Sequence, residues 1–141
     1  MKFIKILITA LVLMGLSAAL MPASAGAKGI RWQSMSDAMA RSKAENKKIF
    51  VHFYADWCGT CKEMESKTFR DPGVIRTLNK NYLPVKVNVD KNKKLSDMFK
   101  ITLLPDTWFI TENNEIIGNR PGYISPEQLK ALLKMFLEDD F

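Results

Sequence analysis

The apolar residues of this chain follow two spacings, one typical of buried strands and one of amphipathic helices. Positions 49–54 (IFVHFY) are β-branched or aromatic almost without a break, which predicts a central strand buried on both faces. Positions 82–90 (YLPVKVNVD) alternate valine with polar residues and predict a second strand, with Pro84 at its start because proline cannot donate to an interior ladder. Near the C-terminal end a helical face is predicted from Leu129, Leu132, Leu133, Phe136 and Leu137.

Capping and turn residues divide the remaining chain into short elements. Ser36, Asp71-Pro72 and Ser125-Pro126 are expected to start helices, and Gln128 completes a capping box with Ser125. The other predicted elements are a helix from the cysteines through 67, a helix over 94–99, and strands over 30–32, 107–111 and 115–118, the last two joined by an Asn113-Asn114 turn. Strand–helix alternation that ends in a hairpin predicts an α/β fold with a mixed central sheet and helices on both faces.

The first 25 residues have the layout of a secretory signal peptide. Lys2 and Lys5 form a basic head, positions 6–20 are almost wholly apolar, and Ala23-Ser24-Ala25 offers a cleavage site. An apolar run of this length is short for a membrane-spanning helix, although an uncleaved N-terminal anchor is the alternative. We therefore expect a signal peptide over 1–25, a single domain over 26–141, and a periplasmic protein.

Charge favours a solvated surface over a nucleic-acid site. The chain carries 21 basic and 15 acidic side chains, a net charge of +6, and the lysines are scattered among acidic residues. Nucleic-acid binding requires a concentrated basic patch, which this pattern does not predict, so no nucleic-acid partner is expected.

The only two cysteines, Cys58 and Cys61, lie three residues apart at the end of the predicted central strand and the start of a helix. As a structural staple they would close a very short loop and contribute little stability. At a helix start, however, unpaired backbone N–H groups and the helix dipole stabilise a thiolate, which is the reactive species in disulfide exchange. The pattern indicates a dithiol that opens and closes, with Cys58 attacking and Cys61 resolving.

The stretch Trp57-Cys58-Gly59-Thr60-Cys61-Lys62 resembles the active site of thioredoxins, with Thr60 where thioredoxin itself has proline. The longer run 54–74 is similar to the C-terminal thioredoxin-like domain of DsbD, the bacterial membrane thiol:disulfide interchange protein, and the resemblance continues more loosely over 32–137. It implies a thioredoxin fold and a thiol:disulfide oxidoreductase in which Cys58 is the nucleophile and Cys61 the resolving thiol.

The same resemblance assigns the substrate-binding residues. Trp57 would belong to the contact surface, and Gly59 and Thr60 would tune the redox potential. Leu104-Pro105 would form the cis-proline loop that faces the dithiol, where Pro105 shapes a groove for an extended substrate strand.

Three residues depart from the family pattern or leave its use open. His52, the only histidine, stands where thioredoxins carry a buried aspartate, and is either a core histidine with a satisfied hydrogen bond or a replacement proton acceptor. Glu65 matches an acidic position of DsbD and either shares that task or is a solvated helix carboxylate. Asp106, where thioredoxins mostly have threonine, either raises the pKa of the thiol or points to solvent and selects positively charged partners.

Two other functions are possible for this cysteine pair besides disulfide exchange. Cys58 and Cys61 with His52 as a third ligand could handle copper, although no second cysteine–histidine cluster exists and no resident metal is expected. Covalent haem is excluded for this motif because Lys62, not histidine, follows Cys61. A non-catalytic adaptor that only binds partners is the third possibility, and an intact cysteine pair argues against it.

We expect a monomeric periplasmic protein-disulfide reductase with no cofactor besides its own dithiol. By the resemblance, its electrons would come from a membrane thiol carrier of the DsbD or CcdA type. They would pass to periplasmic proteins that contain disulfides, apocytochromes of cytochrome c maturation among them.

Overall fold

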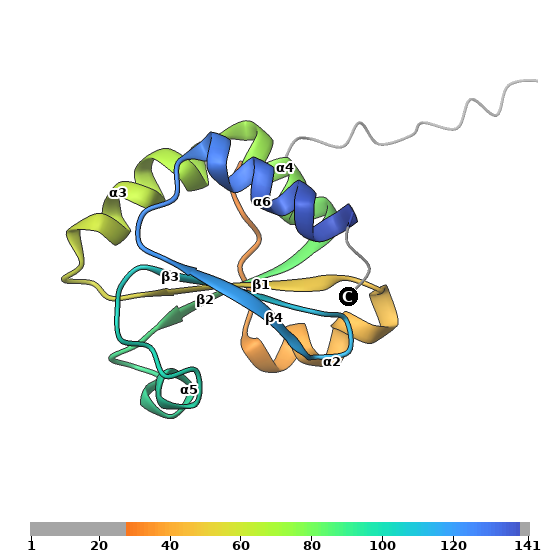
Figure 1. Cartoon of the computed structure of the whole chain (residues 1–141), viewed down its shortest axis with the longest axis horizontal. Coiled ribbons are helices and arrows are strands. Elements are labelled where there is room, and N and C mark those ends of the chain that lie inside the picture. The colour runs from red at the N-terminus through yellow and green to blue at the C-terminus, as the bar shows by residue number, and fades with distance from the viewer. Residues whose placement is uncertain (1–27, 139–141) are drawn as a thin grey trace, which may run out of the picture.

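The computed structural model describes residues 28–138, whose centre is a four-stranded mixed sheet (Figure 1). In chain order the elements are α2 (Met35–Glu45), β1 (Lys48–Tyr54), α3 (Gly59–Lys67), the 3-10 turn η1 (Thr68–Arg70), α4 (Pro72–Asn81), β2 (Tyr82–Asn88), α5 (Lys93–Met98), β3 (Asp106–Ile110), β4 (Ile116–Pro121) and α6 (Pro126–Glu138). The strand order is β2-β1-β3-β4; β1 runs parallel to β2 and antiparallel to β3, and β4 runs antiparallel to β3. The predicted mixed sheet is confirmed.

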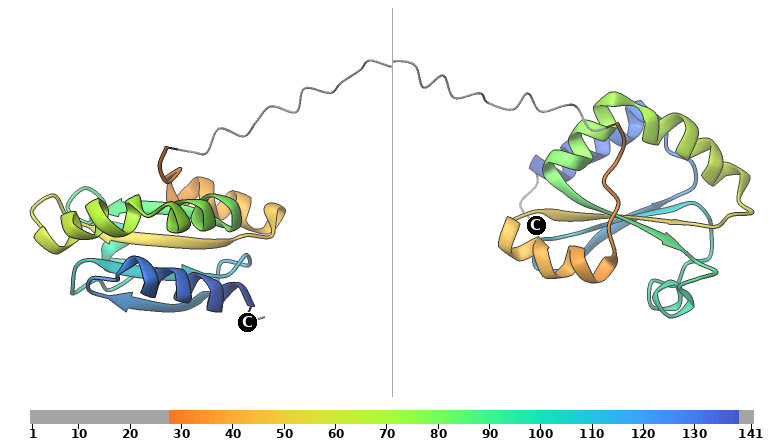
Figure 2. Two further views of the ribbon diagram at one scale, coloured as in Figure 1. Left: turned by 90° about the horizontal axis from the view of Figure 1, so that it is seen from above. Right: turned by 180° about the vertical axis from the view of Figure 1, so that it is seen from behind.

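Strand β1 is central and buried on both faces, as the apolar run predicted. Residues 49–53 are all buried, because α3, α4 and α6 cover one face of the sheet while α2 and α5 cover the other (Figures 1 and 2). Successive side chains of a strand point to opposite faces, so Phe50 joins the core under α3, α4 and α6, and Val51 joins the core over α2 and α5.

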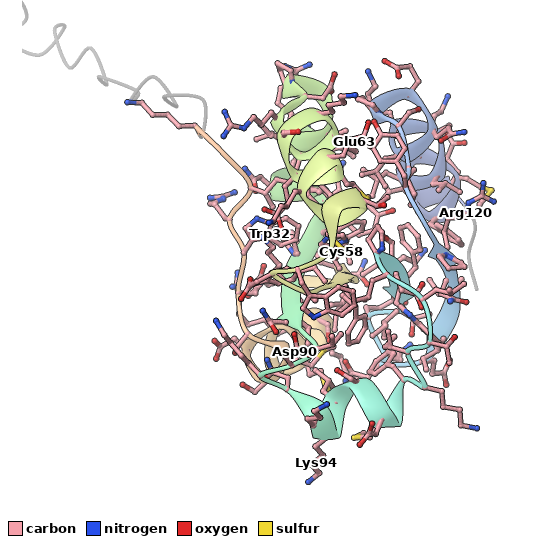
Figure 3. All side chains as sticks on the ribbon, turned by 90° about the vertical axis from the view of Figure 1, so that its left-hand side faces the viewer. Trp32, Cys58, Glu63, Asp90, Lys94 and Arg120 are labelled. Carbon is pink, nitrogen blue, oxygen red and sulfur yellow. A yellow bond between two sulfur atoms is a disulfide. The ribbon has the colours of Figure 1, made fainter. Side chains whose placement is uncertain are left out.

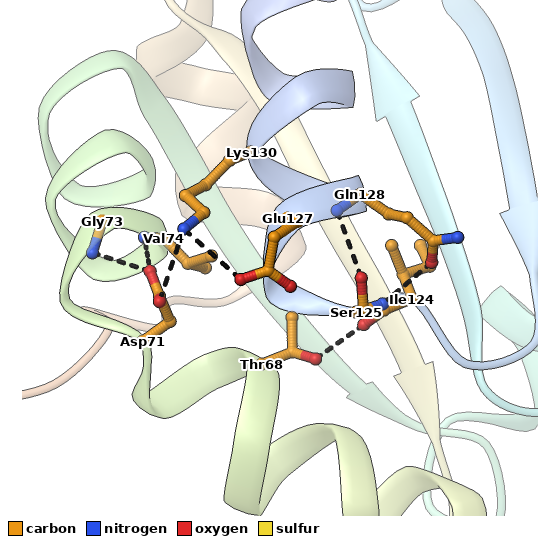
Figure 4. A network of polar contacts seen from close by, with 9 residues as sticks. All are labelled: Thr68, Asp71, Gly73, Val74, Ile124, Ser125, Glu127, Gln128 and Lys130. Carbon is orange, nitrogen blue, oxygen red and sulfur yellow. Dashed lines mark hydrogen bonds and ion pairs between the residues drawn. The ribbon is translucent and has the colours of Figure 1, made fainter.

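The helix starts around α4 and α6 are fixed by the residues that the sequence indicated. The Asp71 carboxylate accepts hydrogen bonds from the backbone N–H groups of Gly73 and Val74 at 2.8 and 2.9 Å. Ser125 and Gln128 form the predicted capping box, each side chain accepting from the other residue's backbone N–H. The two helix starts lie close together, since Lys130 of α6 forms an ion pair with Asp71 at 3.5 Å (Figure 4).

Helix α2 begins two residues earlier than predicted. Its N-cap is Ser34, whose Oγ accepts the backbone N–H of Asp37 at 3.1 Å, and Ser36 lies inside the first turn. The reason is local: the Asp37 carboxylate accepts the Ser34 hydroxyl at 2.6 Å, so Ser34 gains two bonds at the helix start.

The strand predicted over 30–32 is wrong. Among the described residues this segment makes only an isolated parallel bridge, one residue later, between Gln33 and Val85. The Gln33 backbone N–H donates to the Pro84 carbonyl at 3.0 Å, which places the polar groups of Pro84 on the side of β2 that faces away from β1. Pro84 is therefore tolerated as the third residue of β2 rather than its first, because its missing N–H removes no bond to β1.

The predicted signal peptide lies outside the described residues. Within residues 28–138, no helix combines the length and the apolar character needed to cross a bilayer.

The parallel pairing of β1 and β2 has a direct consequence for the site, because the carboxyl ends of both strands lie at the same edge of the sheet.

Candidate active site

The two cysteines lie where β1 ends and α3 begins, joined in the structure by a disulfide (Figure 3). After Tyr54 the chain turns, and the Cys58 backbone N–H donates to the Ala55 carbonyl at 3.2 Å. The Cα atoms of Cys58 and Cys61 are 5.3 Å apart, a separation usual for a disulfide-bonded pair. The strand end and this turn therefore deliver both sulfurs to one point at the edge of the sheet.

The surroundings of the two sulfurs differ. Cys58 is the N-cap of α3, and its Sγ accepts the backbone N–H of Cys61 at 3.1 Å. Cys61 lies one turn inside the helix and is 1% exposed, compared with 6% for Cys58. A negative charge on the Cys58 sulfur would meet a backbone donor and the positive end of the helix, both of which favour the thiolate. The geometry suits an outer nucleophile and an inner resolving thiol.

A groove of about 580 Å³ opens beside Cys58, between the cysteine turn and α5. Gly59 and Thr60 are exposed at its rim, and a Cβ built on Gly59 meets no atom within 4 Å. Leu103, 64% exposed, and Leu104 line the groove from the loop before β3. The Leu104–Pro105 peptide bond is cis, as the family resemblance implied.

Trp57 stands at the mouth of this groove with 70% of its surface exposed. Its indole Nε1–H donates to Oδ2 of Asp90 at 2.9 Å, which holds an otherwise free aromatic ring in place. Sequence reasoning missed Asp90. A usable signal existed, since Asp90 lies two residues after the end of β2, and the parallel strands β1 and β2 end at the same edge of the sheet, where Cys58 lies.

Glu65 points from α3 to β2 and forms an ion pair with Lys86 at 2.7 Å. Lys86 also lies over the Tyr54 ring, 4.2 Å from its centroid. The carboxylate is half-buried and its charge is balanced by this lysine. A role for Glu65 in proton transfer stays a prediction.

His52 is fully buried among aromatic rings, on the side of β1 that α3 covers. Its ring centroid lies 4.7 Å from that of Phe69, edge to face, and 6.4 Å from that of Trp32. Within the described residues neither ring nitrogen has a hydrogen-bond partner, and the same holds for Oγ1 of Thr107, its cross-strand neighbour in β3.

Burial governs the titration of His52. It lowers the pKa of the imidazole from 6.5 to about 3, and the nearby positive charge of Lys86 acts in the same direction. His52 is therefore uncharged at neutral pH. The hydrogen bond expected for a simple core histidine is not formed within residues 28–138, and a role in proton transfer stays a prediction.

Asp106 follows the cis-proline and does not point to solvent, so that alternative is wrong. It is 4% exposed, and in the sheet it pairs with Phe53 of β1 and Pro121 of β4. Burial raises the pKa of its carboxyl, and Asn119 of β4 offsets part of the effect by donating to both oxygens at 3.0 and 3.2 Å. Asn119 is a second partner that sequence reasoning missed.

The described residues contain no group of three or more histidine, cysteine, aspartate or glutamate side chains placed to hold a metal. His52 in particular does not join Cys58 and Cys61 as a third ligand. The arrangement that is present can form and break a disulfide. A sulfur that lines the groove at a helix start, a more deeply buried sulfur behind it, an exposed tryptophan and a cis-proline together define a thiol:disulfide oxidoreductase.

Comparisons with known proteins agree with this class. The family model of the thioredoxin-like domain matches residues 35–137. The chain is 36% identical over 107 residues to the thiol:disulfide interchange protein DsbD of Haemophilus influenzae, covering 70% of this chain and 18% of DsbD. It is 35% identical over 89 residues to a thioredoxin of Mycoplasmoides gallisepticum, covering 63% of this chain and 84% of the thioredoxin.

Among solved structures, a thioredoxin from Thermus thermophilus superposes with a TM-score of 0.71 at 22% identity, covering 78% of this chain and 88% of that one. The fold is thus the thioredoxin fold. The chain belongs to the thioredoxin-like family, and it spans less than a fifth of the length of the DsbD proteins that it matches.

Proposed function

We propose that this protein is an exported protein-disulfide reductase that receives electrons from a membrane thiol carrier. The observation that carries the exchange chemistry is the hydrogen bond from the Cys61 backbone N–H to the Cys58 sulfur at the start of α3. A donor in this position lowers the free energy of the Cys58 thiolate, which is the species that attacks a substrate disulfide. Support for the reductive direction and the membrane donor comes from the likeness to DsbD.

The reaction would run in two exchanges. The Cys58 thiolate attacks one sulfur of a substrate disulfide, forms a mixed disulfide and releases the other substrate sulfur as a thiolate, which takes up a proton. Cys61 then loses its proton and attacks the Cys58 sulfur, which forms the Cys58–Cys61 disulfide and releases the second substrate thiol. Two electrons pass to the substrate, and the protein's own dithiol is the only redox group required.

The proton of Cys61 must leave before the second exchange. We assign His52 and Glu65 as candidate acceptors: both lie on the side of β1 where α3 packs, and Glu65 is on α3 itself. The neutral state of His52 and the ion pair of Glu65 leave each able to accept a proton only transiently. Replacing His52 by Asp, the residue usual in the family, would show the contribution of the imidazole as a change in the pH profile of disulfide reduction.

A dithiol on a DsbD-type carrier would restore the reduced protein, and exported proteins with disulfides, apocytochromes included, would be the substrates. The likeness to DsbD supports this direction. Equilibration with glutathione tests it: we expect a reduction potential nearer the roughly −270 mV of thioredoxin than the roughly −120 mV of a strong oxidant. A potential above about −150 mV would overturn the reductive direction.

Trapping identifies the substrates and tests the adaptor alternative. A Cys61→Ser variant cannot resolve its mixed disulfides, so substrates should accumulate as adducts on Cys58 that thiol reductants release. A Cys58→Ser variant is the matched control and should form no such adducts. If the Cys58→Ser variant retained full function, the protein would be an adaptor rather than an enzyme.

A further inference from the structure

The segment that precedes α2, residues 28–33, passes α4 at Asn79 and crosses the sheet over β2 towards α2, as Figure 2 shows. Asn79 of α4 donates to the Gly29 carbonyl at 3.0 Å and accepts the Arg31 backbone N–H at 2.8 Å. The Arg31 guanidinium donates a hydrogen bond to the backbone carbonyl of Asn79 at 2.9 Å, and Gln33 forms an isolated parallel β-bridge with Val85 of β2. This N-terminal segment and α4 therefore form one continuous surface.

That surface carries five exposed cations, and we call it the lead–α4 surface: Lys28, Arg31, Arg70, Arg76 and Lys80. Lys28 and Arg70 line one depression of about 600 Å³, and Arg76 and Lys80 lie one helical turn apart on α4. Within residues 28–138 none of the five is in an ion pair, so their charges face solvent uncompensated.

The carboxylates of α3 and α6, and the one that caps α4, have lysine partners. Glu63 and Glu65 of α3 pair with Lys67 and Lys86, each at 2.7 Å. Asp71, the N-cap of α4, pairs with Lys130 at 3.5 Å, and the two described glutamates of α6 lie within 4 Å of lysines on their own helix. In the described part of α3, η1, α4 and α6 every carboxylate thus has a lysine within 4 Å, although Asp71 and Glu127 share Lys130.

We propose that the lead–α4 surface binds the anionic headgroups of a phospholipid membrane. Its cations are long, exposed side chains spread over a helix and an extended segment, which suits mobile lipid headgroups that can gather around them. The surface is separate from the dithiol, and the binding does not depend on the redox state.

The test uses the chain from Gly26, which contains every described element, and vesicles of phosphatidylcholine with or without about one third phosphatidylglycerol. We expect binding to the anionic vesicles alone, weakening as salt is raised. The variant Arg70→Gln/Arg76→Gln/Lys80→Gln should bind on the order of a hundredfold more weakly, because each basic residue near an anionic leaflet contributes about a fivefold factor.

The control variant Lys43→Gln/Lys94→Gln/Lys100→Gln removes the same charge from α2 and from α5 and its following loop. It should stay within about fivefold of the parent affinity, because charges farther than a Debye length from the lipid are screened. Equal weakening of both variants would show a non-specific charge effect and overturn the proposal. Equal binding to neutral and anionic vesicles would also overturn the proposal. The absence of any vesicle binding would overturn it as well, and is the result expected if the partner were an acidic protein. Both variants should still reduce a soluble protein disulfide, which keeps this test independent of the proposed function.

Discussion

Lowering the pH from 7 to 5 should destabilise this protein through the buried, neutral side chain of His52. The folded protein holds the imidazole neutral, with its pKa lowered by burial to about 3, while in the unfolded chain the pKa returns to about 6.5. Between these two values the unfolded state binds a proton that the folded state does not. The free energy of unfolding must therefore fall as the pH falls below 6.5.

The size of the effect follows from linkage. At pH 5 the unfolded histidine is almost fully protonated and the folded one is not, which costs about 2 kcal/mol of stability relative to pH 7. The full effect, about 5 kcal/mol, is reached only below pH 3. The value at pH 5 changes little if the folded pKa is anywhere below about 4, and the sequence contains no other histidine to confuse the result.

The assay is urea unfolding of the oxidised protein at pH 7, 6 and 5, compared with a His52→Phe variant. Phenylalanine suits a site walled by Trp32 and Phe69, where within the described residues the imidazole makes no hydrogen bond. Between pH 7 and 5 the parent should lose about 2 kcal/mol more than the variant. Burial also raises the pKa of Asp106, which acts in the opposite direction, but this contribution is the same in both proteins and cancels in the difference. Equal changes in the two proteins would refute the burial of a neutral His52.

Three further predictions concern single contacts. Asp71→Ala removes the two bonds at the start of α4 and should cost about 1–2 kcal/mol in urea unfolding, most of which Asp71→Asn should restore. Asp90→Ala releases the Trp57 indole and should raise the KM for a protein disulfide about threefold to tenfold, with kcat nearly unchanged; a loss confined to kcat would contradict this. Asp106→Asn removes a buried negative charge next to the cis-proline and should lower the pKa of the Cys58 thiol, measured by thiolate absorbance; an unchanged pKa would separate Asp106 from the dithiol.

What the sequence predicted well depends on local rules. The buried run of β1 and the capping of α4 by Asp71 are encoded within a few neighbouring residues, and the structure has both. The family resemblance added the cis bond before Pro105, which no local rule favours. Helix α2 began at Ser34 rather than Ser36 because two serines could cap it and only one also bonds the Asp37 carboxylate.

The missed features are contacts between residues distant in the sequence. A polar residue such as Asp106 is ordinarily expected at the surface, yet the pairing of β3 with β4 buries it and supplies Asn119 thirteen residues later. The partner of Glu65 is Lys86, which the parallel register of β1 and β2 places opposite His52. Neither contact can be read from periodicity, because strand order and register decide them.

The side chains around the inner part of the site now suggest how the thiolate is kept stable. A buried carboxylate at position 52, usual in the family, would place a negative charge on the side of β1 that α3 covers and would oppose the Cys58 thiolate. Here His52 is neutral and the charge of Glu65 is balanced by Lys86, so this side of the sheet adds no net negative charge. The backbone donor at Cys61 and the helix dipole therefore act on Cys58 without that opposition. Among residues 28–138, Asp106 is the buried carboxylate that would raise the pKa of this thiol.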